Sequence, residues 1–295
     1  MNAIRKIAII GATGMLGVPV TVALLNAGFA VTALSRKPNE ARRLLPAATQ
    51  IVAADVRDEA SLKRGFAGQD ALYLNLSIAP TERRGDFHTE QQGLEHILSA
   101  ARAAGIKRIG YLSAMIHDSP SRWWVLEVWR NALLRIKGSG IPYTIFYPTN
   151  FMETLPQRHM LGGTFVMTGW SRNRNYWIAG YDFGRQVARS FAIPQAANRE
   201  YVVQGPEAMT YNEAARRFAQ AAGRRRLTLP LFFFHIAGIV SPSMRFNGRI
   251  MATVLRYPER FEAADTWRDL GRPTTTIEEF ARTVETVANE AATCT

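Results

Sequence analysis

The first half of the chain alternates short apolar runs with longer amphipathic stretches. The first apolar run, at 7–10, passes through a glycine turn into a helical stretch at 18–27, and a second run follows at 29–34. This order of strand, turn, helix, glycine and strand predicts a βαβ unit. The alternation then continues, and we expect strands at 50–54, 71–76, 108–112 and 143–147 and helices at 39–45, 59–67, 88–105 and 122–137.

After Pro148 the rhythm changes to short strands mixed with helices. Strands are expected at 164–167 and 201–204, and helices at 183–192, 211–221 and 276–288. The sequence therefore predicts an α/β fold: a doubly wound parallel sheet of the Rossmann type with a smaller C-terminal α+β substrate lobe. We expect residues 1–150 to form the nucleotide-binding domain and residues 151–295 to form the smaller lid region packed on it, with returning segments.

Composition indicates an ordinary globular protein with an unusual charge. Hydrophobic residues make up 47% of the chain and charged residues 20%, whereas the net charge is +12. This charge indicates either a solvated basic surface or a footprint for nucleic acid or acidic ligands. It is dispersed and not interleaved with aromatic residues, which favours the solvated surface, so nucleic acid is not an expected partner.

Cysteine and histidine usage excludes several kinds of site. The single cysteine, Cys294, excludes a disulfide framework and a Cys-rich zinc site, and it suits a reducing cytoplasm. The five histidines lack metal-ligand spacing, so no metal is expected. The N-terminal apolar run leads directly into a glycine turn, as a first strand does, and the stretch at 227–240 is too interrupted to span a bilayer. We therefore expect a cytoplasmic protein without a transmembrane segment.

The sharpest chemical signal is the segment GATGMLG at 11–17. Gly11 allows a tight turn off the strand, Gly14 lets the backbone approach a pyrophosphate, and Gly17 allows close packing of the helix on the strand. Backbone N–H groups and the positive end of the helix dipole then meet the phosphate. The position of this trio, between a strand and a helix, favours dinucleotide binding over a merely structural turn.

The end of the second strand indicates which dinucleotide is bound. An NAD site places an acidic residue there for the ribose 2′-hydroxyl, whereas this chain has Ser35, Arg36 and Lys37. Two cations and a hydroxyl suit a 2′-phosphate, so the expected cofactor is NADP(H). After the third strand, Asp55 is either an acceptor for the adenine amino group or an ordinary residue at a helix N-terminus.

Several segments together resemble a known family: GATGMLG, ADVRD, AARAAGIKRIGYLSA, SGIPYTIFYPTNFME and QGPEAMTYNEAARRFAQAAGR. They are similar to the NmrA-like, NAD(P)-binding branch of the atypical short-chain dehydrogenases, over nearly the whole chain. The resemblance implies a set of cofactor contacts. Thr13, Met15 and Leu16 line the pyrophosphate turn, Arg36 and Lys37 meet the 2′-phosphate, Asp55 and Val56 flank adenine, Ser77 and Ser113 lie by the ribose and nicotinamide, and Pro148, Asn150 and Phe151 close over the nicotinamide.

The chain departs from this family where reductases carry a Tyr-x-x-x-Lys pair. The tyrosine position falls at Val125 and the lysine position at about Trp129. In relatives the pair delivers a proton to a carbonyl oxygen. The replacement donors considered are Ser113, Tyr147, which alternatively serves packing, and His117, which alternatively is a solvated loop histidine.

Two functional hypotheses follow. The first is an NADP(H)-dependent oxidoreductase that acts on a small apolar carbonyl, enone or quinone as its small-molecule substrate. The second is a non-catalytic NADP(H)-binding redox sensor, regulator or assembly factor. The segment 231–234, Leu-Phe-Phe-Phe, is then either buried core or a contact surface, for which a protein partner or a homodimer is considered.

Overall fold

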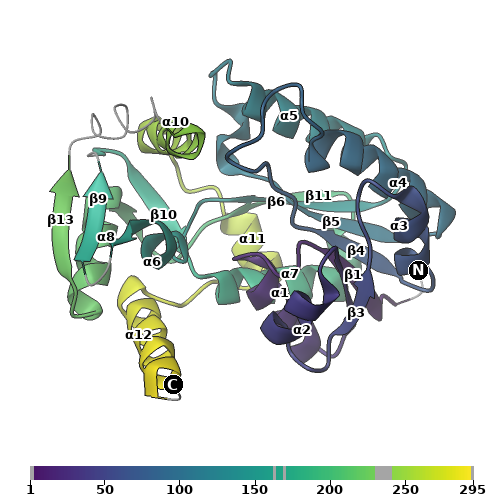
Figure 1. Cartoon of the computed structure of the whole chain (residues 1–295), viewed down its shortest axis with the longest axis horizontal. Coiled ribbons are helices and arrows are strands. Elements are labelled where there is room, and N and C mark those ends of the chain that lie inside the picture. The colour runs from purple at the N-terminus through teal and green to yellow at the C-terminus, as the bar shows by residue number, and fades with distance from the viewer. Residues whose placement is uncertain (1–2, 162–163, 169–170, 230–240, 294–295) are drawn as a thin grey trace. The chain divides into compact units, whose positions relative to one another are not determined.

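The apolar runs of the N-terminal half pair into one parallel sheet (Figure 1). Its strands are β1 Lys6–Ile10, β2 Ala30–Ser35, β3 Gln50–Ala53, β4 Ala71–Leu74, β5 Arg108–Leu112, β6 Tyr143–Pro148 and β11 Arg199–Val203. They lie in the order β3-β2-β1-β4-β5-β6-β11, and every neighbouring pair is parallel. Winding reverses between β1 and β4, which is where doubly wound sheets bind ligands. The predicted fold class is confirmed.

Helices cover both faces of this sheet. α1 (Gly17–Asn26), α2 (Pro38–Leu44) and α7 (Gly180–Ala192) lie on one face, and α3 (Glu59–Phe66), α4 (Leu94–Ala103) and α5 (Trp124–Lys137) lie on the other (Figure 1). The second group packs on the sheet through a single buried cluster that includes Leu62, Ile97 and Leu133. Shorter turns of helix complete this part: η1 Thr89–Gly93, a π-helical turn, η2 Met115–Asp118, η3 Pro194–Ala196 and α11 Ala264–Leu270.

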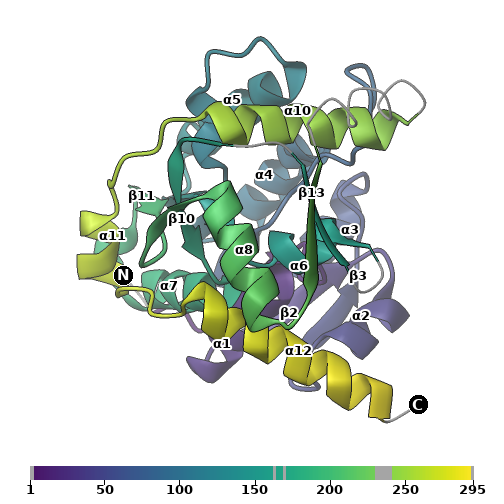
Figure 2. The same ribbon diagram turned by 90° about the vertical axis from the view of Figure 1, so that its left-hand side faces the viewer.

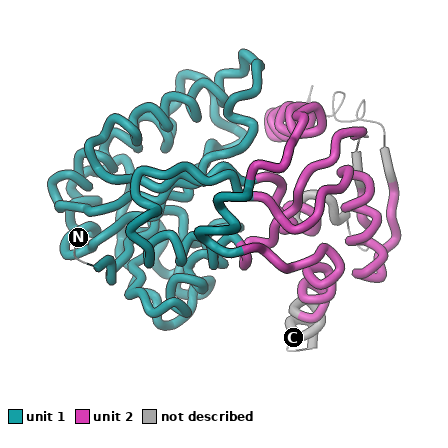
Figure 3. The backbone as a smooth tube through the Cα atoms, turned by 180° about the vertical axis from the view of Figure 1, so that it is seen from behind, with its two compact units in different colours: residues 1–148, 183–203, 263–271 teal, residues 149–182, 204–262, 272–295 magenta. Residues whose placement is uncertain are grey.

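The computed structural model describes residues 3–161, 164–168, 171–229 and 241–293. The chain divides into two compact units (Figure 3). Unit 1 holds the large sheet and consists of residues 1–148, 183–203 and 263–271; unit 2 consists of residues 149–182, 204–262 and 272–295. The strand expected at 201–204 is β11 of unit 1, because its backbone extends the large sheet beside β6.

Among the residues that the structure describes, unit 2 contains two small sheets and four helices. One sheet has the order β12-β10-β7 and the other β13-β9-β8. Buried aromatic residues, among them Phe165, Trp177 and Phe218, form its core, and α8 lies against α12 (Figure 2). The bounds are β7 Asn150–Phe151, β8 Met160–Leu161, β9 Thr164–Thr168, β10 Arg174–Ile178, β12 Ala208–Thr210, β13 Arg225–Leu229, α6 Thr154–His159, α8 Tyr211–Ala221, α10 Pro242–Arg256 and α12 Ile277–Thr293.

Three further findings concern the described residues alone. None of their helices is long and apolar enough to cross a membrane. No group of three His, Cys, Asp or Glu side chains among them is arranged as a metal site would require. The segment 231–234 and Cys294 lie outside the described residues, so the expectations attached to them stay predictions.

Candidate functional site

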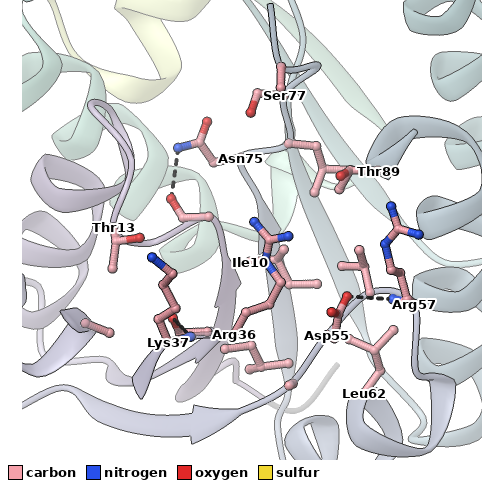
Figure 4. Close-up of a pocket in the computed structure, with 18 of the residues that line it drawn as sticks. Ile10, Thr13, Arg36, Lys37, Asp55, Arg57, Leu62, Asn75, Ser77 and Thr89 are labelled. Carbon is pink, nitrogen blue, oxygen red and sulfur yellow. Dashed lines mark hydrogen bonds between the residues drawn. The ribbon is translucent and has the colours of Figure 1, made fainter. Parts of the chain in front are cut away.

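A pocket of about 410 Å³ lies in unit 1 at the carboxyl ends of β1, β2, β3 and β4 (Figure 4). These strands converge there because winding reverses between β1 and β4, which leaves a crevice at the sheet edge. Seven residues predicted from sequence to contact the cofactor line this pocket together: Gly11, Thr13, Arg36, Lys37, Asp55, Val56 and Ser77.

The glycine turn after β1 is held against the end of β4. Gly11 has a φ of +83°, and a Cβ there would lie 2.1 Å from the carbonyl oxygen of Asn75, so only glycine fits. The Asn75 side chain donates from Nδ2 to the Gly11 carbonyl at 3.1 Å, and its backbone N–H donates to Ile10 at 3.0 Å. Asn75 therefore fixes the turn from the neighbouring strand.

The two later glycines differ in what surrounds them. A Cβ at Gly17 would lie 2.0 Å from the Gly11 carbonyl oxygen, so this glycine is required for α1 to pack on the turn. At Gly14 the nearest protein atoms would be 3.4 Å away, an ordinary contact distance. A Cβ at Gly14 would thus fit against the described chain, so packing within the protein does not require glycine here, as expected where a ligand's phosphates approach the backbone.

The same turn presents backbone donors. Among the described residues, the N–H groups of Thr13, Met15 and Leu16 have no protein acceptor, and Leu16 caps α1 without a side-chain hydrogen bond. Unpaired N–H groups at a helix N-terminus favour an anion. These donors, beside a glycine that packing within the protein does not require, fit a dinucleotide pyrophosphate.

The two cations after β2 are placed differently. The Lys37 ammonium pairs with Glu40 at 2.9 Å, and both side chains are largely exposed. The Arg36 guanidinium reaches into the pocket (Figure 4) and has no hydrogen-bond or ion-pair partner among the described residues. Arg36 therefore has its donors free for an anionic group, whereas Lys37 is already partly neutralised.

Asp55 was expected either to accept from the adenine amino group or to be an ordinary residue at the N-terminus of a helix, and the turn after β3 bears on this choice. The N-terminal cap of α3 is Asp58, whose carboxylate accepts the N–H groups of Ala60 and Ser61. Asp55 lines the pocket instead, and its Oδ1 accepts the N–H of Arg57 at 2.9 Å (Figure 4). One Asp55 carboxylate oxygen thus stabilises the turn, while the Asp55 side chain lines the pocket.

Three predicted residues lie around the ends of β5 and β6. The Ser113 hydroxyl, at the carboxyl end of β5, is buried and has no hydrogen-bond partner among the described residues. His117 stacks on Tyr147 with ring centroids 4.5 Å apart, and its Nδ1 lies 2.8 Å from the carbonyl oxygen of Ala114. A carbonyl can only accept, so His117 carries its proton on Nδ1.

The Tyr147 hydroxyl is committed to structure. It donates to Glu200 at 2.6 Å, and Glu200 also pairs with Lys137 at 2.8 Å. Burial and the Glu200 carboxylate raise the pKa of Tyr147 above its usual value. A higher pKa makes the phenol a weaker proton donor, which is the reverse of what a lysine neighbour achieves in a Tyr-x-x-x-Lys pair.

The positions of the missing pair are filled by a buried valine and a half-buried tryptophan. Val125 is fully buried. The Trp129 indole donates to Glu90 at 2.9 Å, and Tyr111 donates to the other Glu90 oxygen at the same distance. Burial raises the pKa of Glu90 to about 7. The space that a lysine ammonium would occupy is therefore part of a closed hydrogen-bond network.

The three residues expected over the nicotinamide fall at the junction of the units. Pro148 ends β6 in unit 1, whereas Asn150 and Phe151 form β7 of unit 2 and pair with β10. Phe151 is buried. Their contact with a cofactor stays a prediction.

Comparison with protein families identifies the chain. A model of NAD(P)H-binding proteins matches residues 11–168, more than half of the chain. The chain belongs to the NAD(P)H-binding family. The dinucleotide cofactor expected from the glycine turn is thereby confirmed, as is the expected membership of an NAD(P)-binding family.

Members similar to this chain over most of its length differ in role. The NAD(P)H azoreductase of Xenophilus azovorans is 26% identical over 94% of this chain and 96% of its own. Photosystem II assembly factor Ycf39 of Cyanophora paradoxa is 23% identical over 79% of this chain and 74% of its own. The structure of an Escherichia coli NADPH-dependent quinone oxidoreductase with NADPH superposes with a TM-score of 0.71, at 23% identity, over 94% of this chain and 99% of that one.

For this NAD(P)H-binding chain, sequence reasoning missed part of the pocket wall. Arg57, Glu82, Phe87 and Thr89 line the pocket but were not predicted to do so. Asn75 also lines it, as expected of a residue that directly follows β4 beside the winding reversal. Glu82, Phe87 and Thr89 belong to the connection between β4 and α4, whose path depends on tertiary contacts.

Proposed function

We propose that the chain is an NADPH-dependent oxidoreductase that reduces a small, apolar, conjugated acceptor, with quinones as the leading class. The observation that carries the proposal is the pocket at the winding reversal, where the open glycine turn and the unpaired Arg36 guanidinium meet. When bound, NADPH supplies a hydride. The azo and quinone reductases among the relatives support this reaction class.

The preference for NADPH over NADH rests on Arg36. A guanidinium binds a phosphate through two parallel hydrogen bonds, and this one has no competing acid among the described residues. The acids that line the pocket each have another partner. Glu40 pairs with Lys37, and one Asp55 oxygen accepts the Arg57 N–H. Glu82 accepts from the Ala79 N–H and contacts His88. An adenosine 2′-phosphate would therefore meet a cation without displacing an internal partner.

The acceptor class follows from the groups that can move a proton. Hydride addition to a simple ketone gives an alkoxide, which needs an acid at once. In this chain Tyr147 is held by Glu200, and Val125 and Trp129 replace the tyrosine and lysine of the relatives. Hydride addition to a quinone gives a hydroquinone anion, which is stable enough to take its proton from water. The Ser113 hydroxyl is the protein group proposed to hydrogen-bond the acceptor oxygen.

NADPH oxidation with a matched acceptor panel tests this proposal. We expect turnover with quinones and little turnover with unactivated ketones of similar size. Ser113→Ala should lower quinone turnover, whereas Tyr147→Phe should leave it nearly unchanged and only reduce stability by about 1 kcal/mol, the usual value of one hydrogen bond. Equal turnover rates with ketones and quinones, or a large loss of quinone turnover in the Tyr147 variant, would contradict the proposal that the product takes its proton from water.

A second candidate function is a non-catalytic NADPH-binding regulator or assembly factor. The closed network of Trp129, Glu90 and Tyr111 at the place of the catalytic lysine favours it, and one relative is an assembly factor. Stoichiometric NADPH binding without oxidation by any acceptor in the panel would support this function. Quinone turnover that depends on Ser113 would exclude it as the main activity.

A further inference from the structure

The turn after β3 carries an arginine that the cofactor prediction did not include. Arg57 lies in the pocket with its guanidinium carbon 4.1 Å from the centroid of the Phe87 ring. The guanidinium has no ion pair or hydrogen bond with any described residue. Figure 4 shows Arg57 reaching into the same pocket as Arg36, from the end of β3 rather than β2.

The backbone that carries Arg57 is fixed. Its N–H donates to Asp55, and the Asp55 N–H donates to the Ser61 hydroxyl at 3.0 Å. The carbonyl of Val56 lies 2.8 Å from Nδ1 of His96, which ties the turn to α4. The Arg57 side chain therefore projects from a backbone that is already ordered, so this turn does not have to be ordered when a ligand binds.

The ring under the guanidinium is fixed as well. Phe87 lies beside His96, with ring centroids 6.4 Å apart, and precedes the fully buried His88. A Cβ at Gly93 would lie 3.2 Å from Val56 and 3.5 Å from Phe87, so η1 approaches both closely. Phe87 thus holds one face of the Arg57 plane in place.

We propose that the Arg57 guanidinium, held on Phe87, is the stacking surface for the adenine ring of the dinucleotide, which makes Arg57 a cofactor-binding residue. Guanidinium planes stack on aromatic rings on both faces, and adenine is such a ring. This inference rests on the proposed NADPH binding and adds a named partner for the base. In this arrangement Arg36 recognises the 2′-phosphate, and Arg57 recognises the base that NADPH and NADH share.

Binding titrations with three ligands test this assignment. We expect Arg57→Ala to raise the Kd of NADPH and NADH by the same factor, about tenfold, the size of one base-stacking contact. Reduced nicotinamide mononucleotide, which lacks adenosine, should bind the variant and the wild type alike. Arg57→Lys keeps the charge without the plane and should not restore affinity, and Phe87→Leu should weaken both dinucleotides. Arg64→Ala is the matched control, because Arg64 is an exposed arginine of α3 outside the pocket lining.

Two results would overturn the inference while leaving the proposed function intact. One is unchanged dinucleotide affinity in Arg57→Ala. The other is a loss confined to NADPH and restored by Arg57→Lys, which would make Arg57 a phosphate ligand. Failure of the wild-type chain to bind either dinucleotide would overturn the proposed function and the inference together. Equal melting temperatures of the unliganded variants would show that any loss concerns binding alone.

Discussion

Replacing Arg36 by alanine should abolish most of the preference for NADPH. The guanidinium lines the pocket and is exposed, with no partner among the described residues, so its removal breaks no internal contact. A hydrogen bond to a charged group contributes about 1.5–3 kcal/mol. Because this side chain is exposed to solvent, the lower half of that range applies, which corresponds to a rise of roughly 10- to 50-fold in the Kd of NADPH. The Kd of NADH should stay within about twofold.

The neighbouring lysine provides the internal comparison. Lys37 pairs with Glu40 in a largely exposed ion pair, which contributes at most about 1 kcal/mol to stability. Lys37→Ala should therefore weaken NADPH less than Arg36→Ala does. Fluorescence titration of each variant with NADPH and NADH, at a fixed and stated ionic strength, measures both constants. An equal loss for the two dinucleotides, or a larger effect at Lys37, would refute the assignment of the 2′-phosphate to Arg36.

Two further predictions separate stability from binding. Gly14→Ala should leave the melting temperature unchanged and lower the affinity for NADPH, because the nearest protein atoms to the new Cβ are 3.4 Å away. Gly17→Ala should lower both the melting temperature and the affinity, because its Cβ would lie 2.0 Å from a carbonyl oxygen. A drop in melting temperature for Gly14→Ala alone would contradict this. Burial raises the pKa of Glu90 from 4.5 to about 7, so the folded state holds a proton that the unfolded state releases, and the free energy of unfolding should fall as pH rises from about 4.5 to 7. Glu90→Gln, which can still accept from Trp129 and bond Tyr111, should remove that part of the slope in urea unfolding at several pH values; identical slopes in both proteins would disprove the cause.

The N-terminal half of the fold could be predicted because local signals and global structure agree there. The apolar runs are short and the glycines stop the helices, so β1, α1 and β2 fall within one or two residues of expectation. The fourth strand ends at Leu74 rather than at residue 76, and the helix expected from residue 88 begins with the π-helical turn η1. Both places contribute residues to the pocket lining, namely Asn75 and Thr89.

The second half was less predictable because its elements depend on partners distant in sequence. β7, β8 and β12 have two or three residues each, too few for a periodic pattern to appear. α10 was not predicted, although Ser241 caps it, Pro242 opens it and its sequence is amphipathic. Only Leu255 of this helix is buried among the described residues. Short strands and half-buried helices are defined by packing more than by local sequence.

The candidate site likewise has a part that local sequence predicts and a part that depends on contacts between residues distant in sequence. The glycine turn, Arg36 and Asp55 follow strand ends directly, so their meeting could be predicted from the order of the strands. Arg57 and Phe87 come together only because the connection after β4 folds back, with His88 fully buried and in contact with Glu82. The sequence contains no pattern from which this folding back of the connection after β4 could be predicted.

A single-turnover experiment distinguishes a reductase from a protein that only binds NADPH. The chain is first mixed with one equivalent of NADPH, the complex is mixed rapidly with excess quinone, and the fluorescence of bound NADPH is followed with time. We expect complete loss of the NADPH signal with one equivalent of hydroquinone formed, and slower loss in the Ser113→Ala protein. Bound NADPH that stays reduced in the presence of every quinone tried would contradict the claim that this chain is a reductase.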